Sequence, residues 1–100
     1  MKSDAGIALE IAADHPAFAG HFPGDPIVPG VVLLDEAMFA LARATGIVHN
    51  RIASAKFLRP VRPGEALTLR HEIDPSGMVR FEITAGAHKV AVGSLSRAAS

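Results

Sequence analysis

Apolar residues recur along this chain with the two-residue period of a strand in some segments and with the composition of a helix in another. These patterns predict a strand, a helix and four further strands. GIALEIAAD, residues 6–14, has an apolar residue at every second position from Ile7 to Ile11, which indicates a strand. VVLLDEAMFALARAT, residues 31–45, is rich in Leu, Ala and Met and is followed by Gly46, a common helix terminator. Because apolar residues cover most faces of this helix, we expect other structure to surround it.

Four strand-like segments complete the chain, at residues 51–61, 65–73, 78–86 and 88–98. Turn-forming residues separate them, at Pro63-Gly64, Pro75-Ser76-Gly77 and Gly86 to His88. One strand, one long helix and an antiparallel run of strands predict an α+β fold. We therefore expect residues 1–100 to form a single domain, in which a bent antiparallel sheet of about five strands wraps around one long central helix.

Composition and charge narrow the classes of function. The chain has no cysteine, which excludes disulfides and thiolate metal sites, and its formal net charge of zero argues against a nucleic-acid-binding protein. No apolar run approaches the roughly 18 residues of a membrane span, and the acidic N-terminus does not resemble a signal peptide. We expect a soluble cytoplasmic protein. From residue 37 onward nine basic residues face four acidic ones, which favours an acidic partner.

The segment GHFPGDPIVPGVVLLDE, residues 20–36, carries the candidate chemistry. It belongs to a long connection rich in Pro and Gly, and such connections in small domains are usually functional. His21 is a candidate general base, because histidine titrates near neutral pH. Gly30 stands at the predicted helix N-terminus, where free N–H groups and the helix dipole favour negative charge.

Two adjacent acids follow on the predicted helix. At about 100° per residue, Asp35 shares a face with apolar residues that include Val31 and Phe39, whereas Glu36 lies about 20° from Arg43. We therefore predict an ion pair between Glu36 and Arg43, and a functional role for Asp35, because a carboxylate among apolar residues needs a partner or a task. A base, an acid and an anion-stabilising backbone suit removal of a proton α to a carbonyl while a β-hydroxyl leaves.

HFPGDPIVPGVVLLD, residues 21–35, resembles the active-site segment of the 3-hydroxyacyl-[acyl-carrier-protein] dehydratases, the FabA/FabZ type of the hotdog superfamily. That family has His-Phe-x-Gly-x-Pro-x-x-Pro-Gly, with an acid fourteen residues after the histidine, and the interval from His21 to Asp35 is the same. KFLRPVRPGEALTL, residues 56–69, is similar to a second segment of the family. The resemblance extends from about residue 15 to the end of the chain.

The resemblance implies a hotdog fold and a role for each site residue. His21 would be the catalytic base, Asp35 would hold and protonate the leaving hydroxyl, and the Gly30 N–H would bind the thioester carbonyl. Three further residues are expected to line the substrate site beside them: Phe22, Pro29 and Val31. The reaction would convert a 3-hydroxyacyl thioester into the trans-2-enoyl thioester, with no cofactor and no metal.

The resemblance also implies partners. Members of the family form homodimers whose sites combine the histidine of one chain with the acid of the other. Their substrate arrives on the phosphopantetheine arm of an acidic acyl carrier protein, a partner that would suit the basic second half of the chain. The candidate contacts for that partner are Arg51, Lys56, Arg59 and Arg62. We expect no nucleic-acid or membrane partner.

Several alternatives stay open. Inserting one residue aligns Glu36 with the family's acid in place of Asp35, and Phe39 stands where the family often has glutamine. The N-terminal helix and strand of the family are missing or reduced, so the pathway is either fatty-acid synthesis or a specialised lipid or polyketide-like one, such as aryl polyene synthesis. Other functions are a hotdog acyl thioesterase and a degenerate subunit that binds acyl carriers. A metal site built from His15, His21 and nearby acids fits no known ligand spacing.

Overall fold

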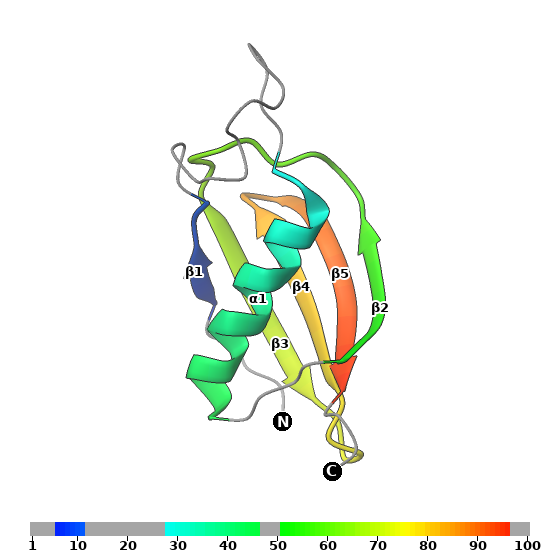
Figure 1. The fold of residues 1–100 in the computed structure, drawn as a ribbon. Helices are drawn as coiled ribbons and strands as arrows, with labels where there is room; N and C mark the ends of the chain where they lie inside the picture. The colour runs from blue at the N-terminus through cyan, green and yellow to red at the C-terminus, as the bar shows by residue number, and fades with distance from the viewer. Residues whose placement is uncertain (1–5, 12–27, 47–50, 97–100) are drawn as a thin grey trace.

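The structure, a computed structural model, describes residues 6–11, 28–46 and 51–96. Within these ranges one helix lies across one face of a five-stranded sheet (Figure 1). The elements are β1 (Ile7–Leu9), α1 (Gly30–Thr45), β2 (Arg51–Phe57), β3 (Leu67–Ile73), β4 (Val79–Ala85) and β5 (His88–Ser96). The α+β class and the order of elements predicted from the sequence are confirmed.

The sheet has the strand order β1-β3-β4-β5-β2, and every neighbouring pair is antiparallel. The first and second strands of the chain therefore form the two edges. β2 pairs with β5 from Arg51 opposite Ser96 to Phe57 opposite Ala91, and a bulge interrupts the ladder between Ile52 and Ser54. One long edge of β2 has no strand beside it among the described residues.

β2 ends four residues before the predicted boundary at residue 61. Pro60 has no N–H to offer a ladder, which explains why a regular strand does not continue through it. The connection nevertheless stays attached to the sheet, because the Leu58 N–H donates to the Val90 carbonyl at 2.7 Å. Its far end turns towards the start of α1, where the Val61 carbonyl accepts the Val28 N–H at 2.7 Å.

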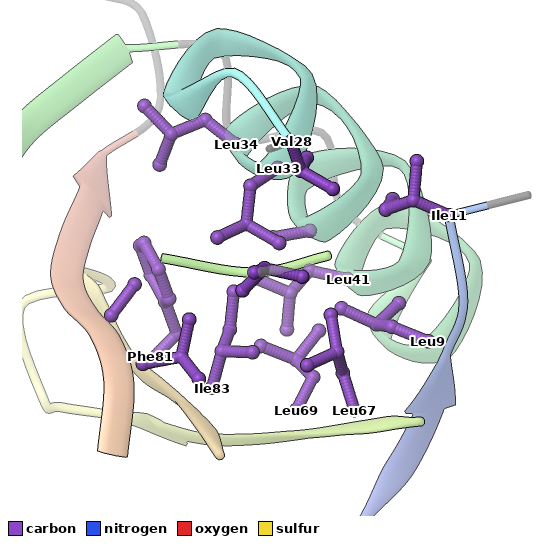
Figure 2. Close-up of a cluster of buried hydrophobic side chains, with 14 of the residues drawn as sticks. Leu9, Ile11, Val28, Leu33, Leu34, Leu41, Leu67, Leu69, Phe81 and Ile83 are labelled. Atoms are coloured by element: carbon purple, nitrogen blue, oxygen red, sulfur yellow. The ribbon is translucent and has the colours of Figure 1, made fainter. Parts of the chain in front are cut away.

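The core lies between the inner face of α1 and the concave face of the sheet (Figure 2). α1 contributes Leu33, Leu34, Ala37 and Leu41, whose spacing of three to four residues places them on one helical stripe. They pack with a larger set of buried strand residues that includes Leu9, Leu67, Leu69, Phe81 and Ile83. Full burial of one such large apolar side chain contributes about 1.5–3 kcal/mol, so this contact fixes α1 on the sheet.

The outer face of α1 is exposed, which differs from the predicted helix surrounded on all sides. Val31 is 68% exposed and Phe39 is 62% exposed, although both are large apolar residues. The other large exposed apolar residues are Ile52 and Phe57 on β2, and Leu58 directly after it. We call these five residues the open face. Among residues 6–11, 28–46 and 51–96, the sheet covers a single side of the helix, and none of these residues covers the second apolar side.

Candidate functional site

The entry into α1 is held by backbone hydrogen bonds at Val28 and Pro29. Val28 is 6% exposed and is tied to Val61, and Pro29 is the N-cap with an extended backbone, φ −59° and ψ 142°. The Pro29 carbonyl accepts the N–H groups of Val32 at 3.0 Å and Leu33 at 3.2 Å. Proline suits this position because its fixed φ sets the direction of the chain into the first turn.

The first turn of α1 keeps free N–H groups. Gly30 and Val31 are the first two helical residues, so their N–H groups have no intrahelical acceptor. No side chain caps this end, the turn contains no acid, and no acceptor for either group occurs in the described part of the chain. The positive end of the helix dipole is thus available to an oxygen that gains negative charge.

An aromatic ring packs directly on Gly30. A Cβ atom at this position would lie 2.7 Å from Cζ and 2.9 Å from Cε2 of Phe57. A glycine is therefore needed while the ring keeps this place. Beside the contact is a pocket of about 500 Å³, within the size range of small-ligand sites. Its lining residues are Val28, Gly30, Leu33, Phe57, Leu58, Arg59, Pro60 and Val61.

Asp35 lies on the exposed outer face of α1, between Val31 and Phe39 at spacings of four residues. This confirms the predicted apolar neighbours of Asp35, which are themselves exposed rather than packed in a core. Five residues of helix separate Asp35 from Gly30, about 7.5 Å along the axis. A single extended acyl group is long enough to contact both positions.

Glu36 opens to a different side of the helix. It is half-buried and lines a pocket of about 370 Å³ between β1 and α1, together with Arg43. The predicted ion pair between these two residues is wrong: the guanidinium of Arg43 lies over the ring of Phe39, 5.8 Å from its centroid, and no ion pair joins it to Glu36. Seven residues separate Glu36 from Arg43 by about 10.5 Å along the axis, whereas Phe39 is one turn away.

Two predicted site residues, His21 and Phe22, lie outside the described residues, and the positions assigned to them stay predictions. The predicted substrate-site residues Pro29, Gly30 and Val31 are adjacent at the α1 N-terminus. Among the described residues, no group of three His, Asp or Glu side chains converges as metal ligands. In the same part of the chain, no helix is long and apolar enough to cross a membrane.

The four cations predicted to contact a carrier protein are exposed but are not equally placed. Only Arg59 lines the pocket beside Gly30. Arg51 and Lys56 belong to β2, and Arg62 lies in the following turn, where its N–H donates to the Glu65 carboxylate at 3.2 Å. Sequence reasoning missed Phe57 and Leu58 as pocket residues. The signal available was their place in KFLRPV, within the segment 56–69 that resembles the family.

Comparisons with known proteins agree with this geometry. The chain matches the ApeI-like family, described as ApeI dehydratase, over residues 1–94. It is 37% identical over 105 residues to the 3-hydroxyacyl-[acyl-carrier-protein] dehydratase FabZ of Chlamydia trachomatis, covering 86% of this chain and 66% of the relative. It is 38% identical over 77 residues to FabZ of Haemophilus influenzae, covering 63% of this chain and 49% of that protein. The chain thus spans 66% or less of the length of these relatives.

Two solved structures share the fold. A chain of the dehydratase heterocomplex ApeI:P from Xenorhabdus doucetiae superposes with a TM-score of 0.76 at 26% identity, covering 96% of this chain and 92% of that one. An uncharacterized protein from Erwinia carotovora subsp. atroseptica gives a TM-score of 0.69 at 28% identity, covering 91% and 79%.

The antiparallel sheet, its single helix and the Pro-Gly entry to that helix define a protein of the FabA/FabZ dehydratase type in the hotdog superfamily. Within that class, the chain belongs to the ApeI-like dehydratase family.

Proposed function

We propose that this protein dehydrates a 3-hydroxyacyl thioester carried on an acyl carrier protein, giving the trans-2-enoyl thioester and water. The observation that carries the proposal is the pairing of a free helix N-terminus at Gly30 with a carboxylate at Asp35 on the exposed side of the same helix. The FabZ relatives, which are 3-hydroxyacyl-[acyl-carrier-protein] dehydratases, support the same reaction.

The proposed mechanism assigns one role to each group. The His21 imidazole removes a proton from C2 of the acyl group, and the electrons of that C–H bond form the C2–C3 double bond. The Asp35 carboxyl protonates the hydroxyl on C3, which leaves as water. Negative charge builds on the thioester oxygen during proton removal, and the Gly30 N–H stabilises it by a hydrogen bond. The reaction is redox-neutral, so the proposed steps need no oxidant or reductant.

We also propose that a second copy of the chain covers the open face. Five large apolar residues on α1, on β2 and directly after β2 are exposed, and exposed apolar residues of this size are typical of interfaces. The free edge of β2 offers unpaired backbone groups to a second strand. In such a dimer, His21 of one copy completes the site at Asp35 of the other. A related but non-identical chain is the alternative, which the heterocomplex of the Xenorhabdus neighbour favours.

The carrier protein is the second proposed partner. An acidic carrier suits the exposed cations Arg51, Lys56, Arg59 and Arg62. Arg59 is the best placed of them to meet the arm that delivers the substrate, because it lines the pocket beside Gly30. The ApeI-like assignment favours a specialised lipid or polyketide-like pathway in the cytoplasm over bulk fatty-acid synthesis.

A turnover assay tests the reaction and its acid. Short 3-hydroxyacyl thioesters on carrier protein are incubated with wild type, His21→Ala, Asp35→Asn and Glu36→Gln, and the enoyl product is followed by absorbance and mass. We expect wild type and Glu36→Gln to turn over, and the other two variants to lose at least about a hundredfold in rate, the usual contribution of one acid–base group. Loss of activity in Glu36→Gln, with Asp35→Asn still active, would identify Glu36 as the catalytic acid in place of Asp35.

The same assay separates two other functions. Release of free thiol without an enoyl product would identify a hotdog thioesterase. A folded wild-type chain that binds carrier protein but forms no product would identify a degenerate subunit.

A further inference from the structure

We propose that Phe57 is the specificity-determining residue of the acyl site, and that its contact with Gly30 sets the length of acyl chain accepted there. This inference rests on the proposed function, because it takes the pocket beside Gly30 to be the place where the acyl group binds. Neither the active-site segment nor the comparisons assign a role to Phe57.

The Phe57 ring leaves no room for a side chain at Gly30. The Phe57 ring occupies the space that any side chain at Gly30 would need, with Cζ, Cε2 and Cε1 at 2.7, 2.9 and 3.2 Å from a Cβ atom placed there. No other side chain ranks among the three atoms nearest that position. The ring is thus the immediate neighbour of the backbone that would bind the thioester carbonyl.

The surroundings let the ring control access. Phe57 is 48% exposed, so one side of the ring contacts Gly30 while the other side is open. It ends β2, and the next residue is tied to Val90 by a backbone hydrogen bond of 2.7 Å. The backbone beneath the ring is therefore fixed, and the size of the side chain decides how much of the pocket stays free.

The remaining wall of the pocket suits an alkyl chain. Its side chains are apolar at Val28, Leu33, Leu58 and Val61, with Arg59 as the one cation among the lining residues. An acyl group whose carbonyl meets the Gly30 N–H has to run past the Phe57 ring to reach this apolar wall. Removing the ring would extend the space available to the chain beyond the carbonyl.

The test compares two chain lengths. Wild type, Phe57→Leu and Phe57→Ala are given four-carbon and eight-carbon 3-hydroxyacyl pantetheine thioesters, and the ratio of the two kcat/KM values is measured. We expect the ratio to move towards the longer chain by roughly tenfold in Phe57→Ala and by less in Phe57→Leu, since small changes in pocket volume give discrimination of this order. Phe57→Leu keeps an apolar side chain at the end of β2 and guards against loss of folding.

Leu58→Ala is the matched control. Leu58 lines the same pocket and is 43% exposed, but it is not among the atoms nearest Gly30. We expect it to change the ratio much less than Phe57→Ala. An equal shift in both variants, or an unchanged ratio in Phe57→Ala, would overturn the inference.

A double-variant cycle tests the contact with Gly30. Gly30→Ala places a methyl group where the ring lies, so it should displace Phe57 and shift the ratio in the wild-type background. In the Phe57→Ala background the same methyl group meets no ring and should add little. An equal effect of Gly30→Ala in both backgrounds would contradict the proposed coupling.

Binding measurements keep this test separate from the test of activity. Saturated four-carbon and eight-carbon acyl pantetheine amides have neither a 3-hydroxyl group to eliminate nor a thioester to cleave, so their Kd values give the length ratio without turnover. If wild type binds them but forms no product, the proposed reaction fails while the Kd ratio still decides the role of Phe57. If wild type turns over and neither ratio responds to Phe57→Ala, the reaction stands and this inference fails.

Discussion

Single residues on α1 decide which chemistry this helix presents. Asp35 and Glu36 are adjacent, yet Asp35 opens outward and Glu36 opens towards β1. Two sequence features predicted Asp35 as the catalytic acid: its distance of fourteen residues from His21 and its place on the helical wheel. The apolar residues beside it on the helix are those that the wheel predicted. The wheel failed for Glu36 and Arg43 because it records angle alone and leaves out the rise along the axis.

The Asp74 carboxylate accepts several hydrogen bonds within the turn between β3 and β4. Its Oδ1 accepts hydrogen bonds from the Ser76 hydroxyl, from the Ser76 N–H at 2.9 Å and from the Met78 N–H at 3.1 Å. The Ser76 hydroxyl contributes most to holding the pKa of Asp74 below its ordinary value of 3.8, and the Met78 and Ser76 amides and the charge of Arg80 add to it. These bonds close the turn between β3 and β4.

The lowered pKa predicts a pH-dependent effect of Asp74→Asn. A carboxylate with a lowered folded-state pKa adds stability above 3.8, the ordinary value, and this contribution disappears as the pH falls through the lower folded value. We expect the variant to melt at a lower temperature than wild type near neutral pH, with a small difference because the carboxylate is exposed. Thermal unfolding monitored by circular dichroism over a pH series measures it. A difference that persists unchanged in strong acid would contradict the assignment.

At the scale of the element, α1 ends where the sequence predicts. Gly46 adopts a left-handed backbone, φ 73°, and its N–H donates to the Ala42 carbonyl at 2.9 Å. No atom lies within 4 Å of a Cβ placed at this position. Any cost of a side chain there therefore comes from the backbone conformation and not from a clash.

Gly46→Ala should reduce the free energy of unfolding by about 1 kcal/mol, because alanine is disfavoured in the left-handed region. Gly46→Asn should cost less, since asparagine tolerates this conformation better. Urea unfolding of the three proteins measures the difference. Equal stability of wild type and Gly46→Ala would mean that residue 46 does not keep the left-handed conformation in solution.

Local sequence patterns predicted the elements but not their pairing. The hydrophobic period and the turn residues predicted one helix and five strands in the right order, because both signals depend only on nearby residues. The position of β2 at the sheet edge beside β5 depends on pairing between distant segments, and no local pattern reports it. The apolar faces of α1 were predicted as well. The proposed cover of the second face is another chain, and no local pattern in one sequence reports such a contact.

At the scale of the whole molecule, the open face predicts self-association. We expect wild type to have the mass of a dimer in size-exclusion chromatography with light scattering. Ile52→Asp places a charge on the free edge strand, at an apolar residue that is 44% exposed, and should shift the mass towards a monomer. Ala8→Asp is the matched control, because Ala8 is exposed on β1 at the opposite edge of the sheet. Loss of the dimer in both variants, or in neither, would contradict this use of the open face.

The central claim is that His21 of one copy and Asp35 of another form one dehydratase site. The most direct measurement is the rate of enoyl thioester formation by His21→Ala and Asp35→Asn, separately and after unfolding and refolding them together in equal amounts. Each variant alone should be inactive. The mixture should recover roughly a quarter of the wild-type rate, because random pairing in a two-fold dimer makes half of the dimers mixed, each with one intact site. A mixture as inactive as its components, from a wild type that turns over, would contradict a site shared between two copies.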